Sequence, residues 1–223
     1  MNKKSETALE YFFYGEDIEM WKLHTPQDYL MAFSAVAACI LLLVIIAKIM
    51  NAQRDQGRAV ARTNKRLRSL AKKPFKYFEN VTLRLPDGTI DVDGLLMDRR
   101  GIYLIKIYGW GTKVFGTPEG PTWRREDRER KETFPNPLLD IKKGISAIEG
   151  ILDEKGLPTV KVTPMIVFAD TFSTPELYLG YGSFSTTYFE MKAWYNKQSN
   201  VSSTMYDFDT VAAIIEKEII IKK

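Results

Sequence analysis

The sequence has one cysteine and one histidine in 223 residues, Cys39 and His24. A disulfide needs two cysteines, and a structural zinc site needs several cysteines or histidines, so neither can form within one chain. Cys39 lies inside an apolar run and His24 near the N-terminus, which excludes a Cys–His or Ser–His catalytic couple. Hydrolytic chemistry would therefore depend on carboxylates, lysine, tyrosine or a metal ion.

Excess positive charge is confined to one segment. Residues 1–28 contain three basic and six acidic residues, whereas residues 48–73 contain nine basic residues and one acidic residue. Because the net charge of the whole chain is +4, the remainder from Pro74 onward carries −1. A nearly neutral domain weakens the inference, from the basic isoelectric point, that the partner is a nucleic acid.

An uncharged run of 19 residues, from Tyr29 to Ala47, predicts a transmembrane helix. At 1.5 Å per residue such a helix crosses a hydrocarbon core. Thr25, Pro26 and Asp28 form a helix start with a capping box, and the residues before it are acidic, unlike those of a signal peptide. The basic flank after the run predicts that the N-terminus lies outside and the large domain in the cytoplasm.

These features divide the chain into four predicted parts. Residues 1–28 form an acidic extracytoplasmic tail, as a surface helix, a disordered segment or an aromatic-rich segment on the membrane surface. Residues 29–47 form the transmembrane helix. Residues 48–73 form a basic juxtamembrane helix or linker, helical from Ala52 to Leu70 and able to contact anionic headgroups. Residues 74–223 form the cytoplasmic α/β domain.

From Pro74 the pattern changes to strands. Phe75–Leu85 alternates, a Pro86-Asp87-Gly88 turn follows, and Ile90–Met97 with Ile102–Tyr108 predicts a hairpin around the turn at residues 98–101. Later patterns predict a short strand at Thr112–Phe115, a solvated charged segment at Arg124–Glu132, an amphipathic helix at Leu138–Glu154, a buried strand at Val160–Ala169, a Ser/Thr/Tyr-rich loop, a weak segment at Tyr188–Tyr195 and a closing helix at Phe208–Ile220.

Four polar side chains on the predicted hairpin form the candidate site. Alternate residues of a strand share a face, so Asp91 and Asp93 lie on one face of the first strand, and Lys106 and Tyr108 on one face of the second. Two carboxylates can bind Mg²⁺, and a lysine can stabilise charge on an attacked phosphate. A partly buried ion pair without any ligand is the structural alternative.

A series of short motifs in the predicted domain carries a family resemblance. They are Phe78-Glu79-Asn80-Val81 with Leu83, Pro86-Asp87-Gly88-Thr89, Val92-Asp93-Gly94, Arg100 to Ile105, Gly116, Trp123, Asn136-Pro137 and Val162 to Phe168. In order and spacing they resemble the nuclease-related domain, NERD, of the PD-(D/E)xK nuclease-like superfamily. The resemblance covers about Phe78 to Ala169. It implies an α/β fold, with a mixed-sheet, restriction-endonuclease-like core behind one N-terminal transmembrane helix.

The resemblance also implies a metal site, from which this sequence departs. Such nucleases hold a divalent ion with a carboxylate on the first hairpin strand, a Glu-x-Lys on the second and an acid from a preceding helix. Asp93 matches the first position, but Lys106 and Tyr108 stand at the Glu and Lys positions, and no acid occurs between Gln56 and Phe78. Because a cation repels a metal ion, we expect Lys106 to pair with Asp93, and with Asp91 as a further partner.

The sequence therefore predicts a single-pass membrane protein with a catalytically inactive NERD-like domain, acting as a cytoplasmic binding or scaffolding module. Its expected partners are the lipid bilayer and a protein of unknown identity, with no metal or other cofactor. One alternative is a membrane-tethered nuclease in which Asp91 and Asp93 hold Mg²⁺ or Mn²⁺ and Lys113 is a migrated lysine. Another is a nucleic-acid binder without catalysis.

Two further groups are weaker candidates for contacts with nucleic acid. Trp110 and Trp123 could stack on a base, although large aromatic side chains beside glycine are more often part of the core. The basic residues between Arg124 and Lys131 could contact phosphates, but interleaved acidic residues nearly cancel their charge.

Overall fold

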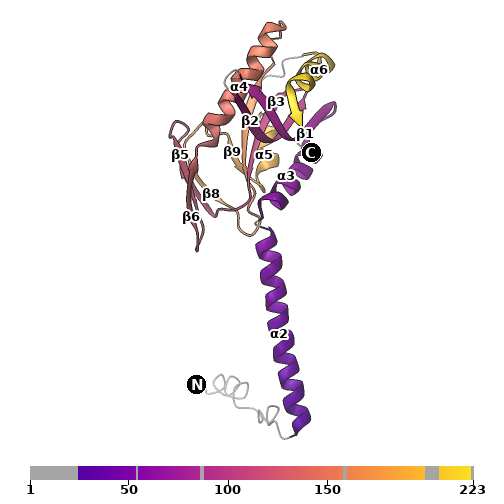
Figure 1. Ribbon diagram of the computed structural model, residues 1–223, viewed down its shortest axis with the longest axis vertical. Coiled ribbons are helices and arrows are strands. Elements are labelled where there is room, and N and C mark those ends of the chain that lie inside the picture. The colour runs from indigo at the N-terminus through magenta and orange to yellow at the C-terminus, as the bar shows by residue number, and fades with distance from the viewer. Residues whose placement is uncertain (1–24, 54, 86–87, 158–159, 199–205, 222–223) are drawn as a thin grey trace, which may run out of the picture. The chain divides into compact units, whose positions relative to one another are not determined.

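A computed structural model of the protein describes residues 25–53, 55–85, 88–157, 160–198 and 206–221. The chain divides into two compact units at Lys48, and the unit from Ile49 onward contains the α/β domain (Figure 1). The predicted fold class, α/β with a mixed sheet and one long apolar N-terminal helix, is confirmed. The predictions for residues 1–24 and for the turn at residues 86–87 lie outside the described residues.

Helix α2 (Pro26–Gln53) begins where the sequence predicts. The Thr25 hydroxyl accepts a hydrogen bond from the Asp28 N–H at 3.3 Å, and the Asp28 carboxylate accepts one from the Thr25 N–H at 2.9 Å. This reciprocal arrangement is the predicted capping box. Within Pro26–Met50, the most apolar stretch of 18 residues has a mean hydropathy of 2.9, and none of that stretch is buried inside the structure. The helix is therefore long and apolar enough to cross a membrane.

The helix predicted from Ala52 to Leu70 is confirmed to its predicted end, but it does not continue unbroken from the apolar helix. Helix α2 ends at Gln53, and a separate helix, α3 (Gln56–Leu70), begins after Asp55. The Asp55 carboxylate accepts a hydrogen bond from the Arg58 N–H at 3.0 Å, and this cap favours a new helix start. Helix α3 buries Ala59, Thr63, Asn64 and Leu67.

Six strands form the larger sheet, in the order β10-β1-β2-β3-β7-β9. The predicted strand and hairpin are confirmed as β1 (Phe75–Leu85), β2 (Gly88–Asp98) and β3 (Gly101–Tyr108), which pair antiparallel. Strands β7 (Val162–Phe168) and β9 (Ser185–Thr187) extend the sheet in parallel. Every residue of β7 is buried, as its apolar run predicts.

The closing helix is shorter than predicted. Helix α6 (Phe208–Glu218) ends two residues early, because Ile219–Ile221 leave the helix as strand β10 and pair antiparallel with Val81–Leu83. Consecutive β-branched residues favour this extended conformation.

A second sheet has the order β6-β5-β4-β8 and contains β4 (Lys113–Gly116), β5 (Thr122–Glu126), β6 (Lys131–Pro135) and β8 (Glu176–Leu179). The short strand predicted at residues 112–115 is confirmed. The charged segment predicted at residues 124–132 is not buried, as expected, but it forms a β-hairpin rather than an irregular excursion. Strand pairing places Trp123 beside Phe134, both buried, and Arg125 beside Glu132. Cross-strand pairing of apolar side chains and of opposite charges stabilises this hairpin.

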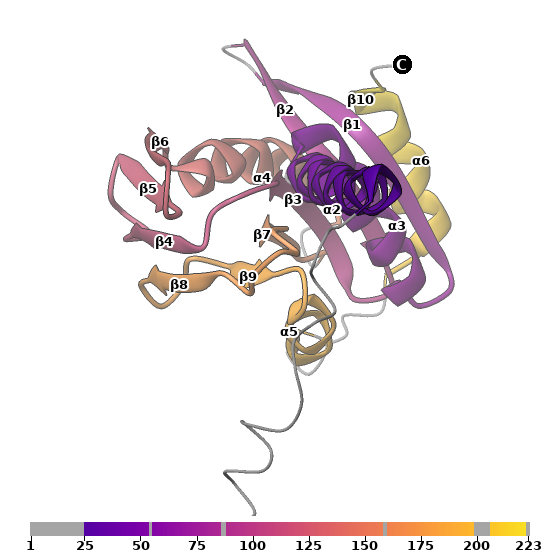
Figure 2. The same ribbon diagram turned by 90° about the horizontal axis from the view of Figure 1, so that it is seen from below.

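Helices cover both faces of the six-stranded sheet. Helix α4 (Pro137–Glu154), as predicted, packs with α6 and the second sheet on one side, which we call the α4 face. Helix α3 packs with α5 (Met191–Gln198) on the other side, the α3 face. The weak segment predicted near residue 188 is thus mostly helical. Figures 1 and 2 both show the second sheet beside the start of α4.

A buried acidic residue joins distant parts of the domain at the hairpin turn. Asp98 is fully buried, and its carboxylate accepts hydrogen bonds from the Tyr195 hydroxyl of α5 and from the Arg100 N–H. Its backbone carbonyl accepts one from the Tyr206 hydroxyl. Burial and the hydrogen bond to Asp98 raise the pKa of Tyr195, so its hydroxyl stays protonated and remains a donor.

We expect Tyr195→Phe to lower the free energy of unfolding by about 1.5–3 kcal/mol, because the charged acceptor Asp98 stays buried without this donor. Tyr206→Phe should cost less, about 0.5–1.5 kcal/mol, since its acceptor is a neutral carbonyl. Urea denaturation of the full chain in detergent, followed by tryptophan fluorescence, measures both. Equal losses for the two variants would contradict the central position of the Asp98 carboxylate.

Candidate functional site

Strands β2 and β3 separate at the candidate site. Their paired register runs from Asp98 opposite Gly101 to Gly94 opposite Ile105, and ends there. Further along β3, the Ile107 N–H donates a 2.7 Å hydrogen bond to the Asp93 carboxylate. The Asp93 side chain therefore serves as the acceptor for a strand N–H at the point where the two strands part.

Side-chain alternation along β2 shifts by one residue at the same place. Leu95 packs on the α4 face, and strict alternation would also direct Asp91 to that face. Val92 packs there instead, close to the position where Asn80 of β1 has a left-handed backbone with φ of 51°. The Asp91 carboxylate accepts a hydrogen bond from Thr82 of β1 at 2.6 Å. The two aspartates predicted to share a face therefore bond to different strands.

Lys106 lies between these two aspartates. Its Nζ is 4.0 Å from Asp93 Oδ2 and 3.4 Å from the backbone oxygen of Asp91. The expected contact with Asp93 is thus present at the outer limit of an ion pair. The contact with Asp91 reaches its carbonyl group rather than its carboxylate. An ammonium group occupies the space that a metal ion would need between these residues.

Burial dominates the electrostatics of Asp93. Desolvation raises the pKa of its carboxyl above the ordinary 3.8, while the charge of Lys106 and the Ile107 N–H lower it by less. The folded protein therefore disfavours the charged form of Asp93.

Tyr108 has a packing role at the position where the family resemblance implies a lysine. Its ring stacks on Phe168 at a centroid distance of 5.5 Å and lies 4.9 Å from the ring of Phe134. The Arg125 guanidinium lies over the same ring at 5.3 Å. Burial raises the pKa of Tyr108, so its hydroxyl remains protonated at neutral pH.

Helix α3 presents amides to this region instead of an acid. Gln56 donates to the Ile107 carbonyl at 2.5 Å and accepts from the Gly109 N–H at 2.8 Å. Asn64 donates to the Asp93 carbonyl at 3.4 Å and accepts from the Tyr77 hydroxyl at 2.7 Å. These neutral side chains connect α3 to backbone groups of the hairpin and add no metal ligand.

A cavity of about 490 Å³ opens on the α4 face beside Lys106. Three basic and three acidic residues contribute to its lining: Asp91, Lys106, Arg125, Glu132, Asp140 and Lys143. The sequence offered Arg125 only within the weak basic cluster at residues 124–131, and it did not identify Glu132, Asp140 or Lys143. Strands β5 and β6 and helix α4 supply these four residues, and no spacing relates them to the hairpin. Lys113 does not line the cavity, and its strand partners are Glu126 and Glu176 in the second sheet.

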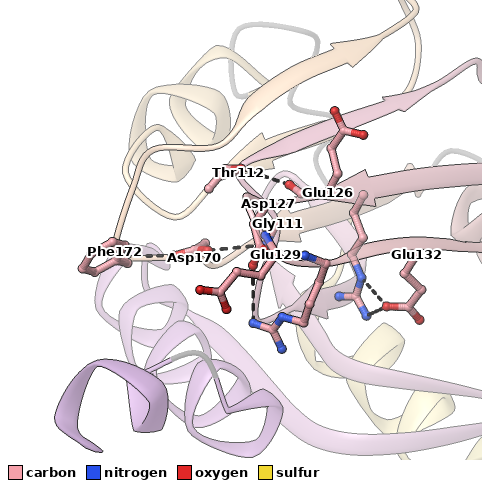
Figure 3. Close-up of polar contacts among 10 residues, drawn as sticks. Gly111, Thr112, Glu126, Asp127, Glu129, Glu132, Asp170 and Phe172 are labelled. Carbon is pink, nitrogen blue, oxygen red and sulfur yellow. Dashed lines mark hydrogen bonds and ion pairs between the residues drawn. The ribbon is translucent and has the colours of Figure 1, made fainter. Parts of the chain in front are cut away.

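Ion pairs and ring contacts hold the cavity's wall in the second sheet. Arg125 donates to Glu132 through Nε at 3.0 Å and Nη2 at 2.7 Å, and Figure 3 shows this pair around Glu132. The guanidinium groups of Arg125 and Arg130 lie 4.1 and 4.6 Å from the Trp110 ring. Trp123 is 1% exposed. It is therefore a core residue and cannot stack on a base.

A buried aspartate links the ends of two strands next to this wall. Asp170, after β7, accepts hydrogen bonds from the Phe172 N–H at 2.9 Å and from the Gly111 N–H after β3 at 3.4 Å (Figure 3). It therefore positions the segment between β3 and β4, which includes Trp110.

The donor set does not fit a divalent metal ion. In the part of the chain that the structure describes, no group of three or more His, Cys, Asp or Glu residues could hold one. Mg²⁺ requires several oxygen ligands in a nearly octahedral arrangement. Asp93 instead accepts a backbone N–H beside an ammonium group, and Asp91 accepts the Thr82 hydroxyl.

We expect Asp93→Asn to gain stability relative to the wild type as the pH rises. The raised pKa means that protonated Asp93 stabilises the fold, and this contribution is lost as the pH rises from 3.8 through the pKa of the folded protein. Asparagine keeps an acceptor for Ile107 and does not titrate. Unfolding free energies of both proteins between about pH 3 and about pH 7 measure the difference.

Asp207→Asn is a control for which the expected pH dependence of relative stability has the opposite sign. Hydrogen bonds from Thr210 lower the pKa of Asp207, so its ionised form stabilises the fold, and this contribution is lost as the pH falls below 3.8. The variant should therefore lose relative stability as the pH rises. The same trend in both variants would contradict our account of Asp93.

Comparison with known proteins places the domain in a family. The model of the nuclease-related domain matches residues 56–169, just over half of the chain. An uncharacterized protein of Bacillus anthracis is 25% identical over 109 residues, which cover 48% of this chain and 51% of that protein. The chain thus spans about half the length of this curated relative. No solved structure matches.

The matched region starts at the first residue of α3 and ends one residue after β7. It includes the hairpin, the second-sheet strands β4 to β6, and α4. These elements supply every charged residue of the cavity. The chain belongs to the nuclease-related domain family.

Proposed function

We propose that this protein is a single-pass membrane protein whose nuclease-related domain lies in the cytoplasm and binds a partner without cleaving nucleic acid. The observation that carries this proposal is the position of Lys106, whose ammonium group lies between Asp93 and Asp91. A fixed positive charge at this point replaces the charge of a metal ion and repels any ion that approaches.

The neighbouring side chains support the same conclusion. Asp93 accepts the Ile107 N–H, and Tyr108 packs against Phe134 and Phe168. A nuclease with migrated residues would need Lys113 near the aspartates, but this lysine belongs to the second sheet. The geometry therefore favours the binding role over the metal-dependent nuclease.

The cavity suits a polar ligand of balanced charge. Three basic and three acidic residues contribute to its lining, but the Asp91 carboxylate is bonded to Thr82 and Arg125 is already paired with Glu132, so the lining has no large excess of either sign. A phosphodiester backbone carries one negative charge per nucleotide and would need excess positive charge at such a site. We therefore propose a polar segment of a protein, carrying both charge signs, as the ligand of the cavity.

Helix α2 supports the membrane anchor. Its apolar part of 25 residues, Pro26–Met50, exceeds the length needed to cross a hydrocarbon core. Nine basic residues follow Ala47 up to Lys73, whereas acidic residues predominate before the helix. Because basic flanks stay in the cytoplasm, the proposed orientation has the N-terminus outside.

We expect no rise in the melting temperature of the wild-type full chain in detergent when Mg²⁺ or Mn²⁺ is added. Lys106→Glu removes the cation and adds a carboxylate beside Asp93, so this variant should gain a metal-dependent rise. Lys106→Gln is the matched control, because it removes the charge without adding a ligand, and should show none. A rise in the wild type that is lost in Asp93→Ala, together with cleavage of DNA or RNA, would support the nuclease instead.

We expect the full chain to float with vesicles of neutral phospholipid and to resist extraction at alkaline pH, because α2 inserts through its apolar length rather than through charge. In intact cells, external protease should remove a tag at the N-terminus and leave a tag at the C-terminus intact. Release by alkali, or cleavage of the C-terminal tag alone, would contradict the proposed anchor or its orientation.

A further inference from the structure

The two helical layers of the domain carry opposite charges. On the α3 face, α3 has five basic residues and no acidic residue, and α5 has two basic residues and no acidic residue. On the α4 face, α4 has two basic and four acidic residues, and α6 has one basic and three acidic residues. The helices of one face thus carry a formal charge of +7 and those of the other −4. Five of these seven basic residues lie on α3, before residues 74–223, and the structure packs them on the face opposite the acidic helices.

Most cations of the α3 face are available to a partner. Arg68 pairs with Glu79 at 2.9 Å. Arg58, Lys65, Lys192 and Lys197 are exposed and form no ion pair with any residue that the structure describes. A surface with several uncompensated cations attracts an extended anionic partner.

An exposed aromatic residue lies among these cations. Phe189 precedes α5 and is 46% exposed, and its carbonyl accepts a hydrogen bond from Arg66 of α3 at 3.4 Å. The neighbouring Tyr188 ring lies under the guanidinium groups of Arg66 and Arg62, at 4.5 and 5.4 Å. A half-exposed phenylalanine next to basic side chains is typical of a surface that enters the headgroup region of a bilayer.

We propose that the α3 face docks the domain onto anionic lipid headgroups of the membrane that holds α2. This inference rests on the proposed anchor. Only five residues separate Met50, the last residue of the apolar part of α2, from the start of α3. Even a fully extended chain of that length reaches at most about 22 Å, so the anchor keeps α3 close to the bilayer. The cytoplasmic leaflet, where the proposed orientation places the domain, is the one rich in anionic lipid.

Charge and tethering favour lipid over nucleic acid as the partner. Each basic residue near an anionic surface raises the ratio of docked to undocked domain roughly fivefold. Three such residues together change it by roughly a hundredfold. A nucleic acid must reach the same face from solution, whereas the anchor supplies the lipid at a high local concentration.

Docking is measured by energy transfer from a labelled domain to acceptor-labelled lipid headgroups. The full chain carries Cys39→Ala, so that a single introduced cysteine can be labelled with the donor. This cysteine is Ala193→Cys on α5 or, as a control, Gly150→Cys on α4. A Cβ added at Gly150 meets no atom within 4 Å. Nanodiscs contain phosphatidylcholine alone or with phosphatidylserine. We expect phosphatidylserine to raise transfer from residue 193 more than from residue 150. Salt should reverse the increase, because the screening length falls to about 3 Å at 1 M.

Two triple variants that change the net charge by the same amount test whether docking depends on the α3 face. Lys65→Glu, Lys192→Glu and Lys197→Glu alter the α3 face, and should abolish the effect of phosphatidylserine by reducing docking roughly a hundredfold or more. Lys142→Glu, Lys155→Glu and Lys217→Glu alter α4, its C-terminal cap and α6, and should retain most of the effect. Equal transfer in the two lipid compositions, or equal loss in the two variants, would overturn the proposal.

Separate readouts distinguish the remaining outcomes. If α2 does not anchor the protein in a membrane, the full chain will not float even with neutral vesicles, whether or not the α3 face carries the triple substitution. If the face binds nucleic acid instead, a fluorescent single-stranded oligonucleotide will bind the chain in detergent and lose affinity in the first triple variant. That result, with no effect of phosphatidylserine, would replace lipid by nucleic acid.

Discussion

The site depends on one hydrogen bond, from the Ile107 N–H to the Asp93 carboxylate, at the point where β2 and β3 separate. A strand that leaves its neighbour exposes an unpaired N–H, and a buried donor without an acceptor is costly. Asp93 supplies that acceptor from its side chain, although burial raises its pKa. The parting of the strands also gives Lys106 its place beside the cavity.

Under our proposal, the same hairpin explains how a nuclease-related fold can persist without metal chemistry. Its strands are held by backbone pairing, by the buried Asp98 with Tyr195, and by side chains on both faces of the sheet. None of these interactions requires a metal ion. Lys106 and Tyr108 can therefore occupy the Glu and Lys positions of the family pattern while the fold remains intact.

The six-stranded sheet separates two surfaces with different properties. The α4 face carries the cavity, whose lining charges balance, and the helices that cover it are acidic overall. The α3 face carries uncompensated cations on α3, which directly follows α2 in the sequence, and on α5. In our proposals the first surface binds a polar partner and the second contacts lipid. Docking through the second surface would leave the cavity accessible from the cytoplasm.

By itself, the sequence determined the elements whose pattern is local. The apolar length of α2, the capping box at Thr25, the hairpin and the buried side of α4 follow from composition and periodicity, and the family motifs follow from residue order. It also identified Lys106 and Asp93 as neighbours.

Only the tertiary structure decided that the charged segment at residues 124–132 is a hairpin, and that Arg125, Glu132, Asp140 and Lys143 share a cavity with Lys106. It also decided that the basic helix α3 packs on the face of the sheet opposite the acidic helices α4 and α6. These features arise from contacts between residues far apart in the chain, where burial and pairing override local propensity.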